Sequence, residues 1–298
     1  MSDIGLVAAS AMPCADAAVP RCEGAHLLPV QGVRAGAAFA LHDWVADEVP
    51  VALEYNGIAQ AVMLATPQDL EDFALGFSLS EGLLASVDEL YDTEQTTTEL
   101  GITLHLRVSG AAFARLKQRR RSMSGRTGCG LCGTESLSQV HRELPALPAP
   151  AAVLALQHQA ISRALTQLQA LQTLQQATGA AHAAAWCSAA GEVKWLREDV
   201  GRHNALDKLI GALVRYGVDA SSGFIVVTSR ASFEMVQKTA SAGVPLLAAV
   251  SAPTSLAVQT AMRCGLTLVG FARRHDLVVY AHPERLALEG LPEGRHAH

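Results

Sequence analysis

Two cysteines separated by two residues are the part of this sequence best suited to chemistry. They lie in Gly128-Cys129-Gly130-Leu131-Cys132-Gly133, which follows the basic residues Arg119, Arg120, Arg121 and Arg126. The thiolate is the reactive form of cysteine, and neighbouring cations lower the pKa of a thiol from its free value of about 8.5. The glycines leave the backbone free to bring the sulfurs close to a partner or a large ligand. From the motif alone, half of a zinc site or a structural turn is an equal alternative.

The other cysteines give no sign of a disulfide framework. The chain has six cysteines in 298 residues, and its start lacks the basic and apolar pattern of a secretion signal. We therefore expect a reducing cytoplasm, where a Cys-x-x-Cys pair is chemical or metal-binding. Cys187 and Cys264 lie in apolar surroundings and are predicted to be small core residues. Cys14 and Cys22 are assigned no role.

The composition excludes several classes of function. Half of the residues are hydrophobic and 17% are charged, as in a globular protein, and the net charge is −5. Broad nucleic-acid binding calls for a basic face, so we expect no nucleic-acid partner. No stretch of about 20 apolar residues is present, so we expect no membrane span.

The elements that must position the thiols begin with a hairpin and a helix. Residues 49–55 and 58–64 are predicted to pair through Asn56-Gly57, which tolerates the positive φ of a two-residue turn. The next helix is predicted to start with Thr66 as N-cap and Pro67 at its first position. A strand over Gly101–Val108 and a helix over residues 111–121 follow. Arginines at the end of that helix also stabilise it by ~0.3–1 kcal/mol, which is an alternative to a functional role.

The second half of the chain alternates short apolar strands with helices, an arrangement that indicates a mostly parallel sheet covered by helices. The predicted strands are residues 183–188, 224–228, 246–250 and 266–271. The predicted helices are a segment containing Ile161, Leu165 and Leu168, and residues 205–216, 233–242 and 255–264. The proline-rich residues 144–150 are predicted to be a linker between the two halves.

Cations stand where two of these helices begin. Arg202 and His203 precede residues 205–216, and Arg230 follows a strand and precedes residues 233–242. Because the positive end of the helix dipole repels cations, these positions are unfavourable unless an anion holds them. We therefore predict that the three bind an external phosphate or similar anion. Arg273 and Arg274 end the last predicted strand and are expected at the same rim of the sheet.

Simpler interpretations exist for the polar residues beside these cations. Ser232, Thr254 and Ser255 are expected to cap helices. Asp199 could pair with Arg202 and have no other role. Neither of the common glycine-rich phosphate loops is present, and neither is the His-x-Glu and Pro-Cys-x-x-Cys signature of the zinc deaminases. A second metal-binding pair at zinc spacing is also missing, which disfavours a structural zinc site.

Several motifs together resemble the formate dehydrogenase accessory sulfurtransferases, the FdhD family. The matching segments are residues 66–74 with Gly76-Phe77 and Ser80-Glu81-Gly82, the thiol segment 129–133, residues 198–208, Thr228-Ser229-Arg230 with residues 234–238, and residues 282–285. They occur in the family's order from about residue 27 to residue 285.

The resemblance implies a sulfur carrier. Such proteins accept sulfur as a persulfide from a cysteine desulfurase and pass it to the molybdenum (or tungsten) bis-guanine-dinucleotide cofactor of formate dehydrogenase. It also implies a homodimer, a site that guanine nucleotides such as GDP can occupy, and no metal site of the protein's own. The implied fold is α/β, a cytidine-deaminase-like three-layer domain with a smaller α+β N-terminal domain.

The resemblance also assigns residues and boundaries. Cys129 carries the persulfide and Cys132 assists it. The family's cofactor loop corresponds to Ala272, Arg273, Arg274, His275, Asp276 and Leu277, although residues 276–278 depart from the usual pattern. The expected organisation is a flexible tail over residues 1–25, an N-terminal domain over 26–143, a cofactor-binding domain over 151–286 and a tail over 287–298.

Three other functions remain open for the thiol pair. A thiol-disulfide oxidoreductase normally carries such a pair at the start of a helix, whereas here glycines and a linker surround it. A non-catalytic chaperone for the cofactor would not need Cys129. A zinc-bound structural loop would contain metal after purification.

Overall fold

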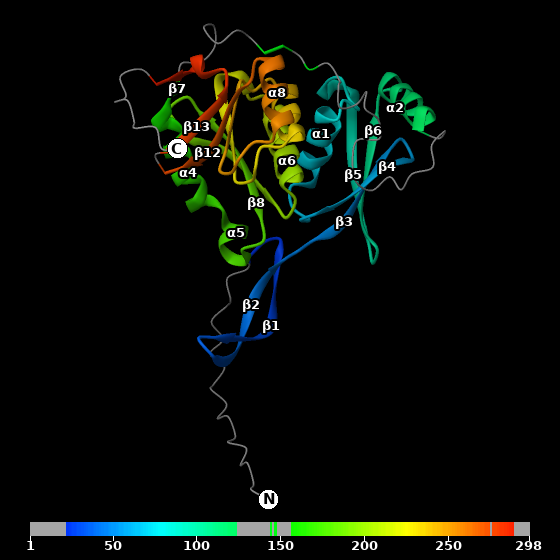
Figure 1. The fold of residues 1–298 in the computed structure, drawn as a ribbon. Coiled ribbons are helices and arrows are strands. Elements are labelled where there is room, and N and C mark those ends of the chain that lie inside the picture. Colours follow the sequence, from blue (N-terminus) through cyan, green and yellow to red (C-terminus); the bar gives the residue numbers. More distant parts are fainter. Residues whose placement is uncertain (1–21, 124–143, 145, 148–155, 275, 289–298) are drawn as a thin grey trace, which may run out of the picture.

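The computed structural model describes residues 22–123, 144, 146, 147, 156–274 and 276–288. Its larger part is built on a six-stranded sheet (Figure 1). In spatial order the strands are β13 (Asp276–Ala281), β12 (Thr267–Arg273), β11 (Leu246–Ala249), β10 (Gly223–Val227), β8 (His182–Ser188) and β9 (Val193–Asp199).

Helices cover both faces of this sheet, so this part of the molecule has three layers. The helices of one face are α6 (Arg202–Arg215), α7 (Phe233–Ser241) and α8 (Ser255–Cys264). The other face is covered by α4 (His158–Leu171), which is followed by the short helix α5 (Thr173–Thr178). The β10 run Ile225-Val226-Val227 is buried because successive side chains enter the two opposite cores.

The expectation of a mostly parallel sheet is wrong. Only the β10–β11 and β11–β12 pairs run parallel, whereas β8 is antiparallel to β10 and β9, and β13 is antiparallel to β12. Antiparallel neighbours need only a tight turn between them, while a parallel pair needs a long crossover. The sequence did not predict the edge strands β9 and β13. The finer deaminase-like description of the fold remains an expectation.

The smaller part contains a four-stranded sheet in the order β4-β3-β6-β5. Its strands are β3 (Val49–Tyr55), β4 (Ile58–Ala65), β5 (Leu90–Thr98) and β6 (Gly101–Val108), and its helices are α1 (Leu70–Ser80) and α2 (Gly110–Met123). The predicted hairpin is confirmed, with positive φ at Asn56 (45°) and Gly57 (83°). Val51, Leu53 and Tyr55 point from β3 into a core shared with α1.

Helix α1 connects the two parts, because it packs on the small sheet and also against α6 (Figure 1). The contact depends on two glycines. A Cβ atom on Gly76 would lie 1.8 Å from the carbonyl oxygen of Asp207, and one on Gly211 would lie 1.9 Å from that of Asp72. The backbones of the two helices therefore approach more closely than any side chain would allow.

The predicted start of α1 is wrong. The helix begins at Leu70, and Asp69 occupies its N-cap position with φ of 51° and no capping hydrogen bond from its side chain. Thr66 is used in a tertiary contact instead: its N–H donates to Asp199 (3.0 Å), and its carbonyl accepts from Lys208 (2.9 Å). A contact across more than 100 residues decides where this helix starts.

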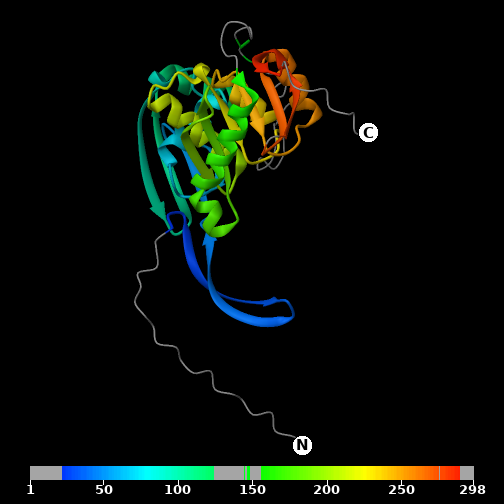
Figure 2. The ribbon, with the colours of Figure 1, turned by 90° about the vertical axis from the view of Figure 1, so that its left-hand side faces the viewer.

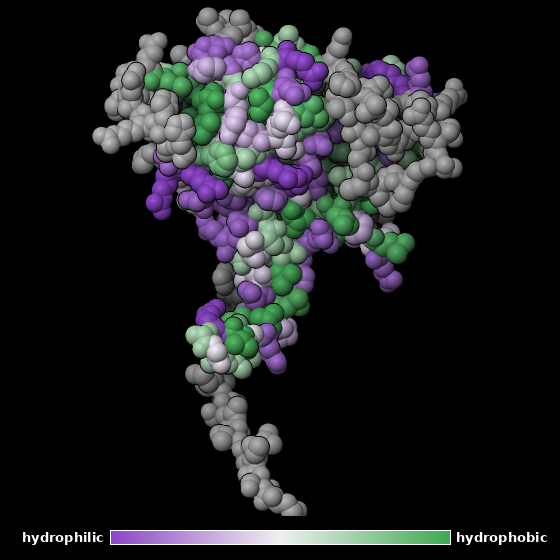
Figure 3. Space-filling model, viewed as in Figure 1, coloured by the Kyte–Doolittle hydropathy of each residue, from purple (hydrophilic) through white to green (hydrophobic). Residues whose placement is uncertain are grey.

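An arm of two strands, β1 (Ala25–Arg34) and β2 (Ala37–Ala46), projects from the body (Figures 1 and 2). It begins at Ala25, within the tail that the sequence predicted. The exposed large hydrophobic residues of the arm are Leu28, Val33, Leu41 and Val45. The pairing register places Val33 on one face of the arm and the other three on the opposite face. On the side of the arm that Figure 3 presents, hydrophobic side chains (green) lie among hydrophilic ones.

The remaining short elements close the ends of the large part. They are β7 (Leu156–Gln157) paired with β14 (Leu286–Ala287), and the 3₁₀ turns η3 (Ala220–Ser222) and η4 (Pro283–Arg285). The 3₁₀ turn η1 (Val87–Glu89) lies in the smaller part, between α1 and β5. Within the predicted linker, Leu147 is buried against the core of the large part, and its N–H donates to the carbonyl of Cys264 (2.9 Å).

Candidate anion-binding site

A cavity of about 970 Å³ lies where the parallel strands end. Thr228, Val250 and Ala272 follow or end β10, β11 and β12, so the carboxyl ends of the three strands open onto it. This edge of an open α/β sheet is where ligands normally bind. The opposite wall comes from the end of α4 and from α5.

Arg273 and Arg274 supply positive charge to the cavity, as the sequence predicted for this rim. The Arg273 Nε donates to the carbonyl of Val250 (3.3 Å), and neither arginine forms an ion pair with any residue that the structure describes. The backbone here is strained, because Phe271 and Arg274 both have positive φ (50° and 49°). Strained residues of this kind cluster at ligand sites.

His182 brings a further titratable group to the same cavity. Burial, assisted by the cations Arg202 and His203, lowers the pKa of His182, and Asp199 acts in the opposite direction. The imidazole is therefore neutral near pH 7. Asp199 pairs with His182 in the β8–β9 ladder, and α6 begins three residues later, so the start of α6 lies near this side of the cavity.

The three cations predicted at helix starts differ in their surroundings. His203 Nε2 lies 3.9 Å from the carboxylate of Glu234, and this imidazole lowers the pKa of Glu234 to about 2. His203 therefore already has an acidic neighbour within the protein. The Arg202 Nε is buried without a hydrogen-bond partner among the described residues. Arg230 is exposed and does not line the cavity.

Asp199 forms an ion pair with Lys208 and not with Arg202, the partner considered from the sequence. Its carboxylate lies 2.7 Å from the Nζ of Lys208, and both side chains are fully buried. The same carboxylate accepts from the N–H of Gly201 (2.7 Å) and from the amide of Asn204 (3.0 Å). Asp199 therefore fixes the first turn of α6 and, through Thr66, the junction with the smaller part.

The caps predicted from the sequence are confirmed in part. The Thr254 hydroxyl accepts from the N–H of Ala257 (3.3 Å) at the start of α8. Ser255 is the first residue of that helix instead of its cap. Ser232 occupies the N-cap position of α7, but its side chain makes no capping hydrogen bond.

The wall that faces the arginines is rich in amides. Gln169, Gln172, Gln175 and Gln176 all line the cavity. Glu198 holds this wall in place, because its carboxylate accepts from the N–H groups of Leu174 and Gln175 (2.9 Å each) at the start of α5. Glu198 therefore affects the cavity indirectly, by fixing the position of α5.

Sequence reasoning missed both His182 and the glutamines. A parallel β8 would place His182 at the opposite edge of the sheet. Because β8 runs antiparallel to β10, its first residue lies at the carboxyl end of β10. The glutamines gave no signal, since such side chains normally cover solvated helix faces.

The remaining predicted site residues lie elsewhere. Cys129, Cys132 and His275 are outside the described residues. Asp276 and Leu277 begin β13, where Asp276 is exposed and Leu277 packs against the core under α4; neither lines the cavity.

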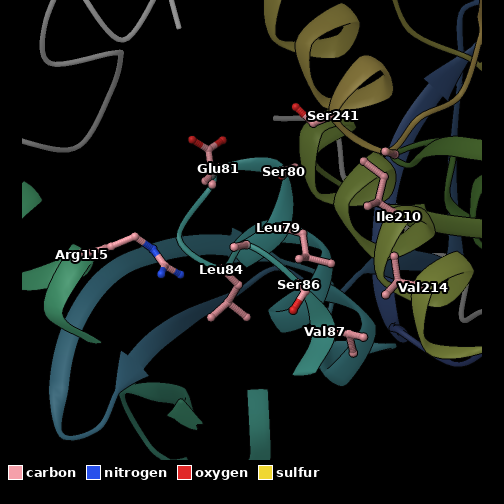
Figure 4. Close-up of a pocket in the computed structure, with 13 residues that line it drawn as sticks. Leu79, Ser80, Glu81, Leu84, Ser86, Val87, Arg115, Ile210, Val214 and Ser241 are labelled. Carbon is pink, nitrogen blue, oxygen red and sulfur yellow. The ribbon is translucent and has the colours of Figure 1, made fainter. Parts of the chain in front are cut away.

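A second cavity, of about 550 Å³, lies between the end of α1 and helices α6 and α7 (Figure 4). Apolar side chains such as Leu79 and Ile210 form much of it, with Glu81 and Arg115 at its edge. These charges already have partners, since Glu81 pairs with Lys238 (2.7 Å) and Arg115 pairs with Glu89. It is therefore a weaker candidate for an anionic ligand than the cavity at the sheet edge.

In the described part of the chain, no group of three or more His, Cys, Asp or Glu side chains is arranged to hold a metal ion. No helix in the same part is long and apolar enough to cross a membrane.

The fold and the cavity define a three-layer α/β protein with a cationic site at the sheet edge, joined to a smaller sheet-and-helix unit. The chain belongs to the FdhD/NarQ family, which it matches over residues 46–287.

Relatives in the family share most of the chain. It is 66% identical over 268 residues to the sulfur carrier protein FdhD of Variovorax paradoxus (strain S110), covering 90% of this chain and 95% of the relative. The sulfur carrier protein FdhD of Cupriavidus necator (strain H16) is 60% identical over 257 residues, covering 86% and 88%.

A solved structure has the same fold. The crystal structure of a protein described as a formate dehydrogenase accessory protein, from Desulfotalea psychrophila, aligns with a TM-score of 0.69 at 22% identity. The alignment covers 88% of this chain and 99% of that one.

Proposed function

We propose that this protein is a sulfur carrier that accepts sulfur from a cysteine desulfurase and delivers it to the molybdenum bis-guanine-dinucleotide cofactor destined for formate dehydrogenase. Two relatives that share most of the chain are named sulfur carrier proteins. The structural observation that carries the proposal is the cationic cavity at the sheet edge, because the cofactor is a polyphosphate ligand.

The sulfur would travel on Cys129. The Cys129 thiolate attacks the terminal sulfur of the desulfurase persulfide, a new S–S bond forms, and the desulfurase cysteine leaves as a thiolate. This exchange involves no net oxidation or reduction. The basic residues that precede the motif in the sequence favour the thiolate. Cys132 would assist the transfer.

The described residues of the cavity suit the cofactor as cargo. Arg273 and Arg274, without carboxylate partners among the described residues, would hold phosphates, and Arg202 begins α6 three residues after Asp199, the residue that pairs with His182. Each charge-assisted contact of this kind contributes ~1.5–3 kcal/mol. Ala272, which is buried, lines the cavity beside these arginines.

The proposal includes a cytoplasmic homodimer. The exposed apolar surface on both faces of the β1–β2 arm supports association with a second copy.

Intact mass spectrometry tests the sulfur-carrying step. Incubation with a cysteine desulfurase and cysteine is expected to add one sulfur, about 32 Da, and the gain is expected to vanish in Cys129→Ala. Cys187 and Cys264 should not carry the sulfur, because burial raises the pKa of both thiols, that of Cys187 to about 12.

The matched control is Cys187→Ala, which should still gain the sulfur. The proposal fails if wild type gains no sulfur, or if cells with Cys129→Ala keep full formate dehydrogenase activity, as a chaperone without thiol chemistry would allow. Vigorous reduction of insulin disulfides would instead favour an oxidoreductase.

A further inference from the structure

Gln172 has an unusual environment for an amide side chain. It is the residue that joins α4 to α5, it is only 5% exposed, and it lines the cavity at the sheet edge. Its backbone N–H donates to the carbonyl of Leu168 (3.1 Å). Its side-chain amide makes no hydrogen bond with any residue that the structure describes.

Two neighbouring glutamines have structural partners instead. The Gln175 Oε1 accepts from the N–H of Ala181 (2.8 Å). The Gln176 Nε2 donates to the carbonyl of Gln169 (2.5 Å). Gln172 is therefore the buried amide of this wall that is left for a ligand.

The Gln172 amide lies beside the cavity instead of being sealed in the core. Its side-chain atoms are not among the described polar atoms that are both fully buried and without a partner. The amide of this otherwise buried residue is therefore open to the cavity that the residue lines, where a ligand can replace water as its partner.

We propose that Gln172 is a specificity-determining residue of this cavity and hydrogen-bonds the nucleobase of the bound nucleotide. An amide presents a donor beside an acceptor, which matches the adjacent carbonyl and N–H of a guanine ring. Arg273 and Arg274 lie on a different wall and would take the phosphates. This inference rests on the proposed function, which places a guanine nucleotide here.

The test uses the full chain and two probes, GDP and inorganic pyrophosphate, with affinities measured by calorimetry. Gln172→Met keeps the length of the side chain and removes its hydrogen-bonding groups. GDP affinity is expected to fall about tenfold to hundredfold. The affinity for pyrophosphate should differ by less than about twofold between wild type and Gln172→Met, because pyrophosphate has no nucleobase for Gln172 to bind.

Melting temperature without ligand gives a second readout. If the amide is unpaired in the free protein, Gln172→Met should melt at the same temperature as wild type or higher. The matched control is Gln259→Leu, an exposed glutamine on α8 that does not line the cavity, which should change GDP affinity less than about twofold.

The outcomes separate the two proposals. Unchanged GDP affinity, equal losses for GDP and pyrophosphate, or a clear drop in melting temperature in Gln172→Met would each overturn the role of Gln172. An equal effect of Gln259→Leu on GDP binding would do the same. If wild type binds pyrophosphate but not GDP, base recognition is wrong, and if it binds neither, the proposed cofactor site itself is wrong.

Discussion

At the scale of single residues, the cavity is formed by groups whose charges are incompletely compensated within the described protein. Arg273, Arg274 and Arg202 lack carboxylate partners there, and burial together with the charge of Arg202 lowers the pKa of His182. By contrast, the charges of Asp199 and Lys208 compensate each other within the core. The first kind of arrangement suits an anionic ligand, and the second stabilises the fold.

The lowered pKa of His182 predicts a pH effect on stability without ligand. The unfolded state binds a proton to this residue at a higher pH than the folded state does. Stability from His182 is therefore present above the ordinary histidine pKa of about 6.5 and is lost as the pH falls toward the folded-state value. Chemical denaturation of wild type and His182→Gln checks this between pH 8 and pH 5.

The expected result is that wild type loses unfolding free energy relative to His182→Gln as the pH falls. His105→Gln serves as the control, because His105 lies on the smaller sheet beside Glu54. A difference between wild type and His182→Gln that stays constant, or grows in favour of wild type at low pH, contradicts the prediction.

At the scale of elements, the close contact between α1 and α6 determines how the two parts of the molecule join. An alanine at Gly76 or Gly211 would place a methyl group inside the backbone of the facing helix. Either substitution is expected to destabilise the protein by about 1–3 kcal/mol, because the helices must separate. Urea denaturation measures this loss.

Gly110→Ala is the matched control, since Gly110 begins α2 and a Cβ there would meet no atom within 4 Å. It should be neutral or slightly stabilising. If Gly76→Ala is as well tolerated as Gly110→Ala, then the contact between α1 and α6 does not limit stability.

At the scale of the whole molecule, the β1–β2 arm stands apart from both cores (Figure 2). Two strands without further packing are marginal in water, so an apolar arm is expected to be covered by a partner. Leu28 pairs with Asp43, so the outer part of the arm, residues 29–42, can be replaced by a two-residue Asn-Gly turn that keeps the pairing of the remaining strands. The shortened chain is expected to keep its circular dichroism and to change from dimer to monomer in light scattering.

The full-length chain is the reference for that measurement. A shortened chain that remains dimeric would place the dimer contact elsewhere, and one that unfolds would show that the arm belongs to the core.

Local patterns in the sequence were sufficient for much of the fold. Asn56-Gly57 predicts its hairpin because the turn depends on adjacent residues, and the apolar run of β10 predicts a buried strand for the same reason. The buried stripe of α6 follows from helical periodicity. Arg273 and Arg274, at the end of β12, could be assigned to the rim of the sheet. Once a strand is predicted from its apolar run, the position of its end is also known.

Tertiary structure decided what depends on residues far apart in the chain. The direction of β8 places His182 at the cavity, the contact with Asp199 moves the start of α1 past Thr66, and the burial of Gln172 leaves its amide facing the cavity. By itself, the sequence determined the local elements, the thiol motif and the position of the basic residues. Strand direction, ion-pair partners and burial required the folded chain, because their energies come from contacts between distant segments.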